Sequence, residues 1–80
     1  MNILAVEVEP TAVDVSFTDH SMSVRLADGR EVTIPLEWSP LLRNATPAER
    51  QRWRLIGGGV GLHWDDIDED ISINSLLRVK

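Results

Sequence analysis

VDVSFTDHSMSVRLADGREVTIPL, residues 13–36, alternates apolar and polar side chains with a period of two in three successive runs. This alternation is typical of strands that bury one face and leave the other face in water. The stretch therefore predicts three antiparallel strands joined as a β-meander. The residues expected to point inward are Val13, Val15, Phe17, Met22, Val24, Leu26, Val32, Ile34 and Leu36.

The first turn of this meander sets which residues face one another. Directly opposed residues share one face of a sheet, so the turn must bring apolar residues opposite apolar ones. A two-residue turn at Asp19–His20 meets this condition, and Asp and His tolerate the left-handed backbone better than most residues. The turn predicts the pairs Phe17 with Met22, Val15 with Val24, and Val13 with Leu26.

The second turn needs one residue more. A two-residue turn at Asp28–Gly29 would place Leu26 opposite Glu31, whereas a loop over residues 27–29 keeps the opposed residues apolar. Gly29 then takes the left-handed position that ends the usual three-residue hairpin loop. The loop predicts the pairs Val24 with Val32 and Met22 with Ile34.

Two further features bound the sheet. Pro35 has no N–H to donate, which predicts that the last strand lies at an edge or ends there. The run LAVEV, residues 4–8, alternates in the same way and predicts a fourth strand, which Pro10 and Thr11 separate from the next.

ATPAER, residues 45–50, has the composition of a helix N-terminus. Thr46 as N-cap, Pro47 at the first helical position and Glu49 reaching back make a capping box. We expect a helix from Pro47 to about Arg54, with Trp53 on its buried side. Its arginines Arg50 and Arg54 are four residues apart and are expected on the solvated face.

Shorter regular segments are expected on either side of this helix. Ser39 and Pro40 predict a single helical turn by the same capping logic. The glycines after Ile56 are expected to end the longer helix and begin extended chain. DISINSLLRVK, residues 70–80, predicts a short strand and then a last helical turn through Leu76 and Leu77.

Together these segments predict one small α+β domain over residues 1–80. Its expected order is an antiparallel β-meander of three to four strands, then short helices, then a short C-terminal strand or helical turn. One buried tryptophan removes about 150–250 Å² of surface from water, so in a domain this small the aromatic side chains are expected in the core. They are Phe17, Trp38, Trp53 and Trp64.

The composition excludes several classes of protein. The chain has no cysteine, which excludes disulfides and thiolate metal sites. Its N-terminus lacks the basic region of a signal peptide, and no apolar run approaches the roughly 20 residues that span a bilayer. A cytoplasmic protein of bacterial type, without a membrane segment, is the expectation.

The charge distribution points to the kind of partner. The net charge is −5, with −5 over residues 1–40, +3 over residues 41–64 and −3 over residues 65–80. This balance disfavours direct binding to nucleic acid, because that affinity comes mainly from neutralised phosphates. It favours a small basic protein as partner. The central arginines could equally meet the acids of residues 65–70 within the fold.

LIGGGVGLHWDDIDED, residues 55–70, contains four glycines and five carboxylates. A P-loop requires Lys and Ser or Thr after its last glycine, but here Leu62 and His63 follow Gly61. The dinucleotide motif fails as well, because Leu62 occupies the position of the third glycine. Gly57, Gly58, Gly59 and Gly61 are therefore interpreted, together with His63 and Trp64, as structural residues that let the backbone turn and pass close to its neighbours.

The same stretch offers ligand types for a metal ion in His63, Asp66, Asp68 and Asp70. Their spacing does not match a calcium loop, so no metal site and no cofactor are predicted. No catalytic residues are predicted either, since there is no cysteine and neither His20 nor His63 has a nucleophile motif beside it. The carboxylates are instead predicted to contact a partner; they are Asp65, Asp66, Asp68, Glu69 and Asp70.

Four segments of the chain strongly resemble the bacterial family called domain of unknown function 2442. They are ADGR, PLEWSPLLRNATPAERQRW, LIGGGVGLHWDDIDEDIS and SLLR, and the resemblance extends from about Val13 to Leu77. The sequence departs from the family at Asp65, where relatives often carry proline, and at Ser39, where an aromatic residue is common.

The resemblance implies a small α+β fold in which a β-meander precedes short helices. It also implies a gene often adjacent to that of a second small protein, as in toxin–antitoxin pairs. Some relatives carry this domain ahead of a helix-turn-helix. No catalytic residues are established for the family, so none is carried over.

Three functions are open from the sequence. The first is a non-enzymatic protein–protein interaction module, an antitoxin-like acidic partner of a small basic protein, which could be a toxin-like product of the adjacent gene. The second is a transcription-associated accessory domain that lacks its own helix-turn-helix. The third is a small metal-dependent enzyme. Homo-oligomerisation through an open sheet edge is a further option.

Overall fold

The computed structural model describes residues 10–77, and the strand expected over residues 4–8 lies outside them. Its strands are β1 (Ala12–Phe17), β2 (Ser21–Leu26), β3 (Glu31–Pro35), β4 (Trp53–Ile56), β5 (Gly61–Trp64) and β6 (Glu69–Ser72). Its helices are α1 (Pro40–Arg43), α2 (Pro47–Gln51) and α3 (Ile73–Leu77), with short 3₁₀ turns η2 (Leu36–Trp38) and η3 (Gly57–Gly59). This is the expected α+β fold.

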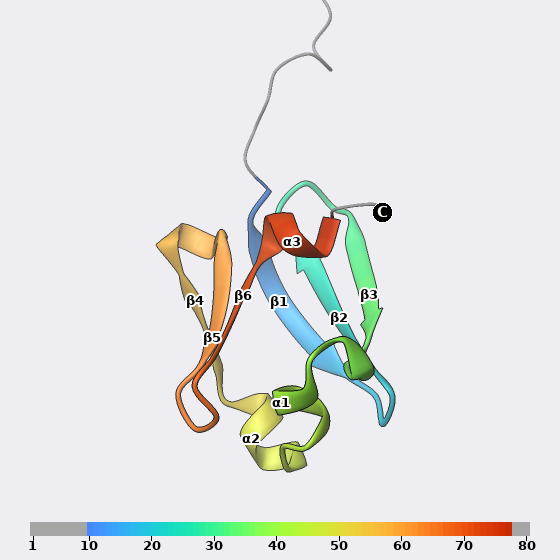
Figure 1. The fold of residues 1–80 in the computed structure, drawn as a ribbon. Helices are drawn as coiled ribbons and strands as arrows, with labels where there is room; N and C mark the ends of the chain where they lie inside the picture. The colour runs from blue at the N-terminus through green and yellow to red at the C-terminus, as the bar shows by residue number, and fades with distance from the viewer. Residues whose placement is uncertain (1–9, 78–80) are drawn as a thin grey trace, which may run out of the picture.

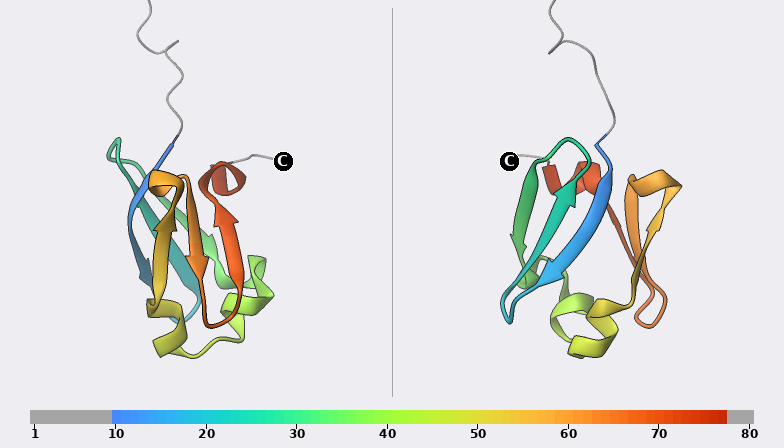
Figure 2. Two further views of the ribbon diagram at one scale, coloured as in Figure 1. Left: turned by 90° about the vertical axis from the view of Figure 1, so that its left-hand side faces the viewer. Right: turned by 180° about the vertical axis from the view of Figure 1, so that it is seen from behind.

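The strands form two antiparallel three-stranded sheets, ordered β1-β2-β3 and β4-β5-β6. Figure 1 shows the two sheets standing side by side, with α1 and α2 closing one end and α3 lying across the other. The views in Figure 2 place β3 and β6 at one side of the pair and β1 and β4 at the opposite side. The inner faces of both sheets supply the core. Its fully buried large side chains are Trp64, Met22, Leu26, Leu42, Leu62, Ile73 and Val24.

The register of the first sheet confirms both predicted turns. Phe17 faces Met22 and Val15 faces Val24 across the first hairpin. Across the second hairpin Val24 faces Val32 and Met22 faces Ile34. Gly29 has φ 95°, the left-handed position expected for it. β3 ends at Pro35 and is an edge strand, as its missing N–H predicts.

The expected pairing of Val13 with Leu26 is wrong. A bulge in β1 between Ala12 and Asp14 brings Ala12 opposite Leu26 instead, and leaves Val13 47% exposed. The η3 turn approaches the backbone of β1 at this point, since a Cβ built on Gly59 would lie 2.8 Å from the Ala12 carbonyl oxygen. This close approach requires a glycine at position 59.

The capping box is confirmed, but the helix is shorter than expected. The Thr46 hydroxyl accepts from the Glu49 N–H, and the Glu49 carboxylate accepts from the Thr46 N–H. The helix ends at Gln51, three residues before Arg54, because Trp53 begins β4 and pairs with Trp64. Strand pairing with β5 thus replaces the last helical turn.

The arginines of this region consequently take different places. Arg54 lies on β4 opposite His63, so the expected helical pair of Arg50 and Arg54 does not form. The Arg50 guanidinium turns back and donates to the carbonyl oxygens of Leu42 and Arg43, both at 2.8 Å. It thereby satisfies carbonyls at the end of α1.

Only part of the aromatic prediction holds. Trp64 is fully buried and its indole N–H donates to the Arg50 carbonyl oxygen at 3.0 Å. Phe17 and Trp53 are partly buried and pack against the core. Trp38, however, is 65% exposed, which contradicts the expectation of a core position. The chain leaves β3 at Pro35 and turns as η2, so that Leu36 points inward and Trp38 outward.

The glycines form η3, a tight turn between β4 and β5, rather than the exit from a helix. Gly57, Gly58 and Gly59 all have positive φ, a conformation that other residues adopt only with strain. The turn and the close approach at Gly59 agree with the structural role expected for these residues. Among residues 10–77, no helix is both long enough and apolar enough to cross a membrane.

Candidate functional site: an acidic strand edge and the groove beside it

The carboxylates of residues 65–70 lie on β6 and on the turn that leads into it, and two of them pair with arginines. Asp65 receives hydrogen bonds from the Arg54 guanidinium at 3.3 Å, and Asp66 forms an ion pair with Arg52. The hydrogen bonds from Arg54 contribute most to lowering the pKa of Asp65. Two of the four central arginines, Arg52 and Arg54, therefore contact this acidic stretch within the fold.

His63 lies between two further carboxylate contacts on the outer face of the second sheet. Its Nδ1 faces Asp70 across the β5–β6 pair, and its Nε2 lies 2.8 Å from Asp65. Carboxylates only accept hydrogen bonds, so two of them beside the ring favour the imidazolium form, in which both nitrogens can donate. The hydrogen bond to Asp70 contributes most to raising the pKa of His63. The negative charges of Asp70 and Asp65 raise this pKa further, whereas desolvation of the ring lowers it.

Glu69 and Asp68 complete the acidic stretch. Glu69 accepts a hydrogen bond from the Ser39 hydroxyl at 2.5 Å, and its other oxygen accepts from the Asp70 N–H at 3.0 Å. Asp68 is exposed in the turn and has φ 52°, a left-handed conformation that Asp tolerates. Four of the five carboxylates that were predicted to bind a partner protein thus already contact a side chain within the described residues; the exception is Asp68.

The possible ligands for a metal ion are dispersed. His63 pairs with Asp70, Asp66 turns to Arg52, and Asp68 lies in the turn. Within residues 10–77, no group of three His, Asp or Glu side chains is placed to hold a metal ion.

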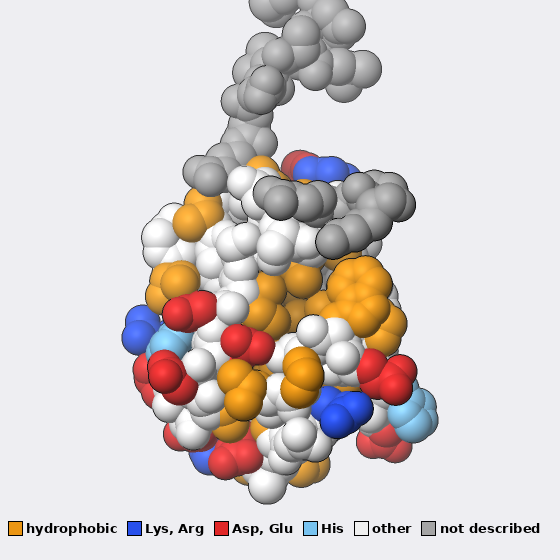
Figure 3. Space-filling model, viewed as in Figure 1, with side chains coloured by type: hydrophobic (Ala, Val, Ile, Leu, Met, Phe, Trp, Pro, Cys, Tyr) orange, Lys and Arg blue, Asp and Glu red, His pale blue; other side chains and the backbone are white. Residues whose placement is uncertain are grey.

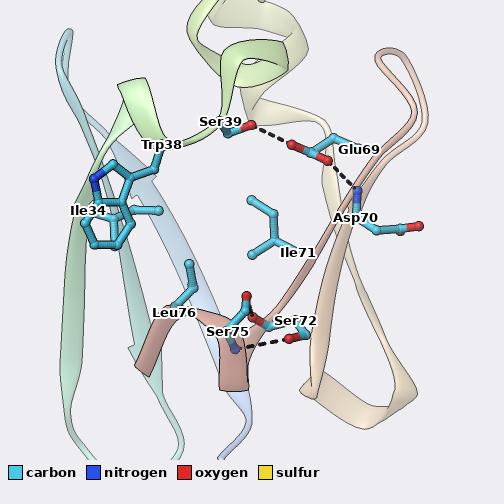
Figure 4. Close-up of a pocket in the computed structure, with 9 residues that line it drawn as sticks. All are labelled: Ile34, Trp38, Ser39, Glu69, Asp70, Ile71, Ser72, Ser75 and Leu76. Atoms are coloured by element: carbon cyan, nitrogen blue, oxygen red, sulfur yellow. Dashed lines mark hydrogen bonds between the residues drawn. The ribbon is translucent and has the colours of Figure 1, made fainter. Parts of the chain in front are cut away.

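A groove of about 470 Å³ opens between the two sheets beside this stretch. Figure 4 shows Ile34 and Trp38 on one side, Ile71 on the other, and Leu76 at the end formed by α3. Figure 3 shows the same region as a hydrophobic surface with acidic side chains near it. The remaining lining residues are polar: Ser39, Glu69, Asp70, Ser72 and Ser75.

The groove lies between two sheet edges. β3 is the last strand of the first sheet and β6 the last strand of the second. The hydrogen bond from Ser39 to Glu69 crosses from the start of α1 to β6 at one end of the groove (Figure 4). Ser39 is itself buried and accepts from the Leu42 N–H as N-cap of α1. The Ser39 side chain therefore links the start of α1 to β6 at this end of the groove.

Sequence reasoning missed this groove although it identified Glu69 and Asp70. Two of its apolar residues, Ile34 and Trp38, were expected in the core, and the groove forms where α3 and β6 return beside β3. The available signal was Pro35, since a strand that ends there cannot continue the alternation from Leu36 to Trp38.

Comparison with known proteins identifies a family. The family model described as "Protein of unknown function (DUF2442)" matches residues 12–80. A search of curated proteins finds no significant match. A crystal structure of a protein of unknown function from Rhodospirillum rubrum is similar, with a TM-score of 0.76 and 26% sequence identity over 88% of this chain and 87% of that one. The family model covers most of the chain, and the chain therefore belongs to the DUF2442 family.

Proposed function

We propose that this protein is a non-enzymatic protein–protein interaction module, the antitoxin-like acidic partner of a small basic protein. The observation that carries the proposal is Trp38, 65% exposed on the wall of the groove beside Ile34. Tryptophan is enriched among the residues that dominate binding energy at protein interfaces, because it buries a large area when a partner covers it.

The charges beside the groove support a basic partner. Glu69 and Asp70 line it, and the chain has a net charge of −5. The arginines near this edge pair elsewhere, Arg52 with Asp66 and Arg54 with Asp65. Glu69 contacts the uncharged Ser39 hydroxyl and keeps its charge, whereas Asp70 shares its charge with His63. Charge complementarity of this kind speeds association and excludes acidic partners.

The genetic setting of the family supports the antitoxin-like part of the proposal. The resemblance to the family implies a gene adjacent to that of a second small protein, and we propose a cytoplasmic bacterial setting for the pair. A toxin held by its antitoxin should arrest growth when expressed alone. The product of the adjacent gene is therefore the first partner to test.

The experiment is co-expression of the chain with a tagged product of the adjacent gene, followed by purification and size-exclusion chromatography. We expect a stable complex, and relief of any growth arrest that the adjacent product causes alone. Trp38→Ala should weaken the complex about tenfold or more, in line with the loss of an interface tryptophan. No complex with the wild-type chain would reject the proposal.

A matched control comes from an exposed apolar residue outside the groove. Leu55 is 40% exposed on β4, the strand at the far edge of the second sheet. Leu55→Ala should leave the affinity of the complex unchanged. If Leu55→Ala weakened the complex as much as Trp38→Ala does, the effect would be due to non-specific hydrophobic contacts and not to the groove.

The acidic stretch is tested with Asp68→Asn, which removes a charge and keeps a residue that accepts positive φ. Reversing Asp66 or Glu69 would also break their contacts to Arg52 and Ser39. If Asp68→Asn, measured at low salt, leaves the association rate unchanged, Asp68 takes no part in attracting the partner.

A further inference from the structure

We propose that the partner binds as an extended segment added in parallel to the edge of β6, with alternating apolar and cationic side chains. This rests on the proposed function and specifies its binding mode. The groove borders the edge of the strand and not one face alone, because all four consecutive residues of β6 line it.

The pairing of β5 with β6 shows which backbone groups face the groove. Antiparallel residues alternate between pairs that exchange hydrogen bonds and pairs that do not. The Ile73 N–H donates to the Val60 carbonyl oxygen at 2.9 Å, one step beyond the pair of Gly61 with Ser72. Counting back from Ile73, the backbone groups of Ile71 and Glu69 point toward β5, and those of Ser72 and Asp70 point away from it.

Two of these four outward groups are already occupied. The Asp70 N–H donates to the Glu69 carboxylate at 3.0 Å, and the Ser72 carbonyl oxygen accepts from the Ser75 hydroxyl at 2.7 Å. No side chain within residues 10–77 binds the other two, which are the Asp70 carbonyl oxygen and the Ser72 N–H. The strand edge therefore offers one acceptor and one donor on either side of Ile71.

This pair of groups matches a parallel strand. In parallel pairing, one residue of the added strand donates to the carbonyl before its opposite residue and accepts from the N–H after it. A segment residue opposite Ile71 would thus bond Asp70 and Ser72 without displacing either side-chain cap. An antiparallel strand would need both groups of one residue, and at Asp70 and at Ser72 one of the two is taken.

Strand geometry then sets the side chains of the segment. The residue opposite Ile71 points inward and packs against the Ile71, Trp38 and Leu76 side chains. Its neighbours point to the outer face, where the Asp70 carboxylate contacts His63 with one oxygen and is still 69% exposed. A cationic side chain there is favoured, so the segment alternates apolar inward with Lys or Arg outward.

Charge argues against a second copy of this chain as occupant. Each copy has a net charge of −5, and a copy seated on β6 would bring more acid toward Glu69 and Asp70. A basic segment of another protein meets these carboxylates with the opposite sign.

The test uses capped synthetic hexapeptides and the full chain. In the probe lysine and valine alternate; one control has the same residues in two blocks, and another has glutamate in place of lysine. We expect the alternating basic peptide to bind at least tenfold more tightly than either control, with a blue shift of Trp38 fluorescence that Trp38→Phe removes. Equal binding of the alternating and block peptides would overturn the proposal.

Substitutions at Ser72 isolate the backbone hydrogen bond. Ser72→Pro removes the outward N–H, which an edge strand tolerates, together with the hydroxyl that caps the Ser75 N–H. Ser72→Ala removes only the hydroxyl and serves as the matched control. We expect Ser72→Pro to weaken peptide binding about tenfold relative to Ser72→Ala. Equal affinities of the two variants would show that no strand is added.

The direction of the segment is read with a spin label on either end of the peptide. A parallel segment places its N-terminus near Glu69 and its C-terminus near α3, so each label should broaden the amide signals at that end only. The opposite pattern would overturn the parallel arrangement. If the peptide binds only after removal of residues 1–9, the occupant is the chain's own N-terminal segment and the proposal is wrong.

The same Ser72 variants, tested in the co-expression complex, separate this inference from the proposed function. A complex broken by Trp38→Ala but retained equally by Ser72→Pro and Ser72→Ala would reject strand addition and keep the interaction module. Failure of the wild-type chain to form any complex would reject the module itself.

Discussion

His63 shows how a single residue depends on its neighbours across a strand pair. Its side chain is only 15% exposed, and both ring nitrogens face carboxylates. The sequence placed His63 in a structural role but gave no reason to pair it with Asp70, seven residues later. That contact exists because β5 and β6 are opposed at these positions.

The raised pKa of His63 makes stability depend on pH in a defined direction. A group whose pKa is higher in the folded chain stabilises the fold fully below its unfolded value, here 6.5, and this stabilisation is lost as pH rises through the folded value. Urea unfolding of wild type and His63→Gln between pH 5 and pH 9 should show the largest difference below the unfolded value.

The control for this prediction is Asp70→Asn, which removes the carboxylate that contributes most to raising the pKa of His63. In this variant an NMR titration should place the pKa of His63 lower than in the wild type. An unchanged titration curve would mean that the imidazolium does not depend on Asp70.

Substitutions at the neighbouring glycines Gly58 and Gly59 distinguish the cost of backbone strain from the cost of a steric clash. Gly58 has φ 72° with open space where a Cβ would lie, whereas Gly59 has φ 103° and its Cβ would meet the Ala12 carbonyl oxygen at 2.8 Å. We expect Gly58→Ala to cost about 1–2 kcal/mol from conformation alone, and Gly59→Ala to cost more because β1 must also move. Equal costs in chemical denaturation would show that the contact with β1 is easily relieved.

At the scale of elements, the first sheet could be predicted well and the second could not. Each strand of the meander carries its own alternation, and Gly29 fixes the loop length between two of them. β4 and β5 have only four residues each and enclose three glycines, so they show no period. The Thr46 capping box correctly marked where a helix begins, but the end of that helix is set by the pairing of Trp53 with Trp64.

The link between α1 and β6 can be measured directly. Ser39 caps α1 and donates to Glu69, so Ser39→Ala should destabilise the fold by about 1–3 kcal/mol. A double-mutant cycle with Glu69→Gln should give a coupling energy of about 1 kcal/mol in urea denaturation. Strict additivity of the two substitutions would mean that α1 and β6 are held in place separately.

At the scale of the whole molecule, both sheets share one core, and α1 contributes to it from the end. Leu42 is fully buried while its neighbour Leu41 is 48% exposed, on the same helix. Patterns along the sequence do not distinguish the two, because which side of so short a helix faces inward depends on how the sheets meet. The groove was missed for the same reason, since it arises where the sheets diverge.

This pair of leucines gives a test of the shared core. Leu42→Ala should cost about 2–5 kcal/mol, as expected for a cavity in a packed interior. Leu41→Ala should change the free energy of unfolding by no more than about 0.5 kcal/mol. Both values are obtained from denaturation curves of the full chain, and a small cost for Leu42→Ala would contradict its place in the core.

The side-chain caps on β6 also bear on symmetry. Two identical chains related by a twofold axis can join their β6 edges only in the antiparallel sense. Glu69 and Ser75 occupy the Asp70 N–H and the Ser72 carbonyl oxygen, groups that such a joint would require. These hydrogen bonds therefore disfavour self-association into a continuous six-stranded sheet. The edge stays open to a strand of a different protein that runs parallel to β6.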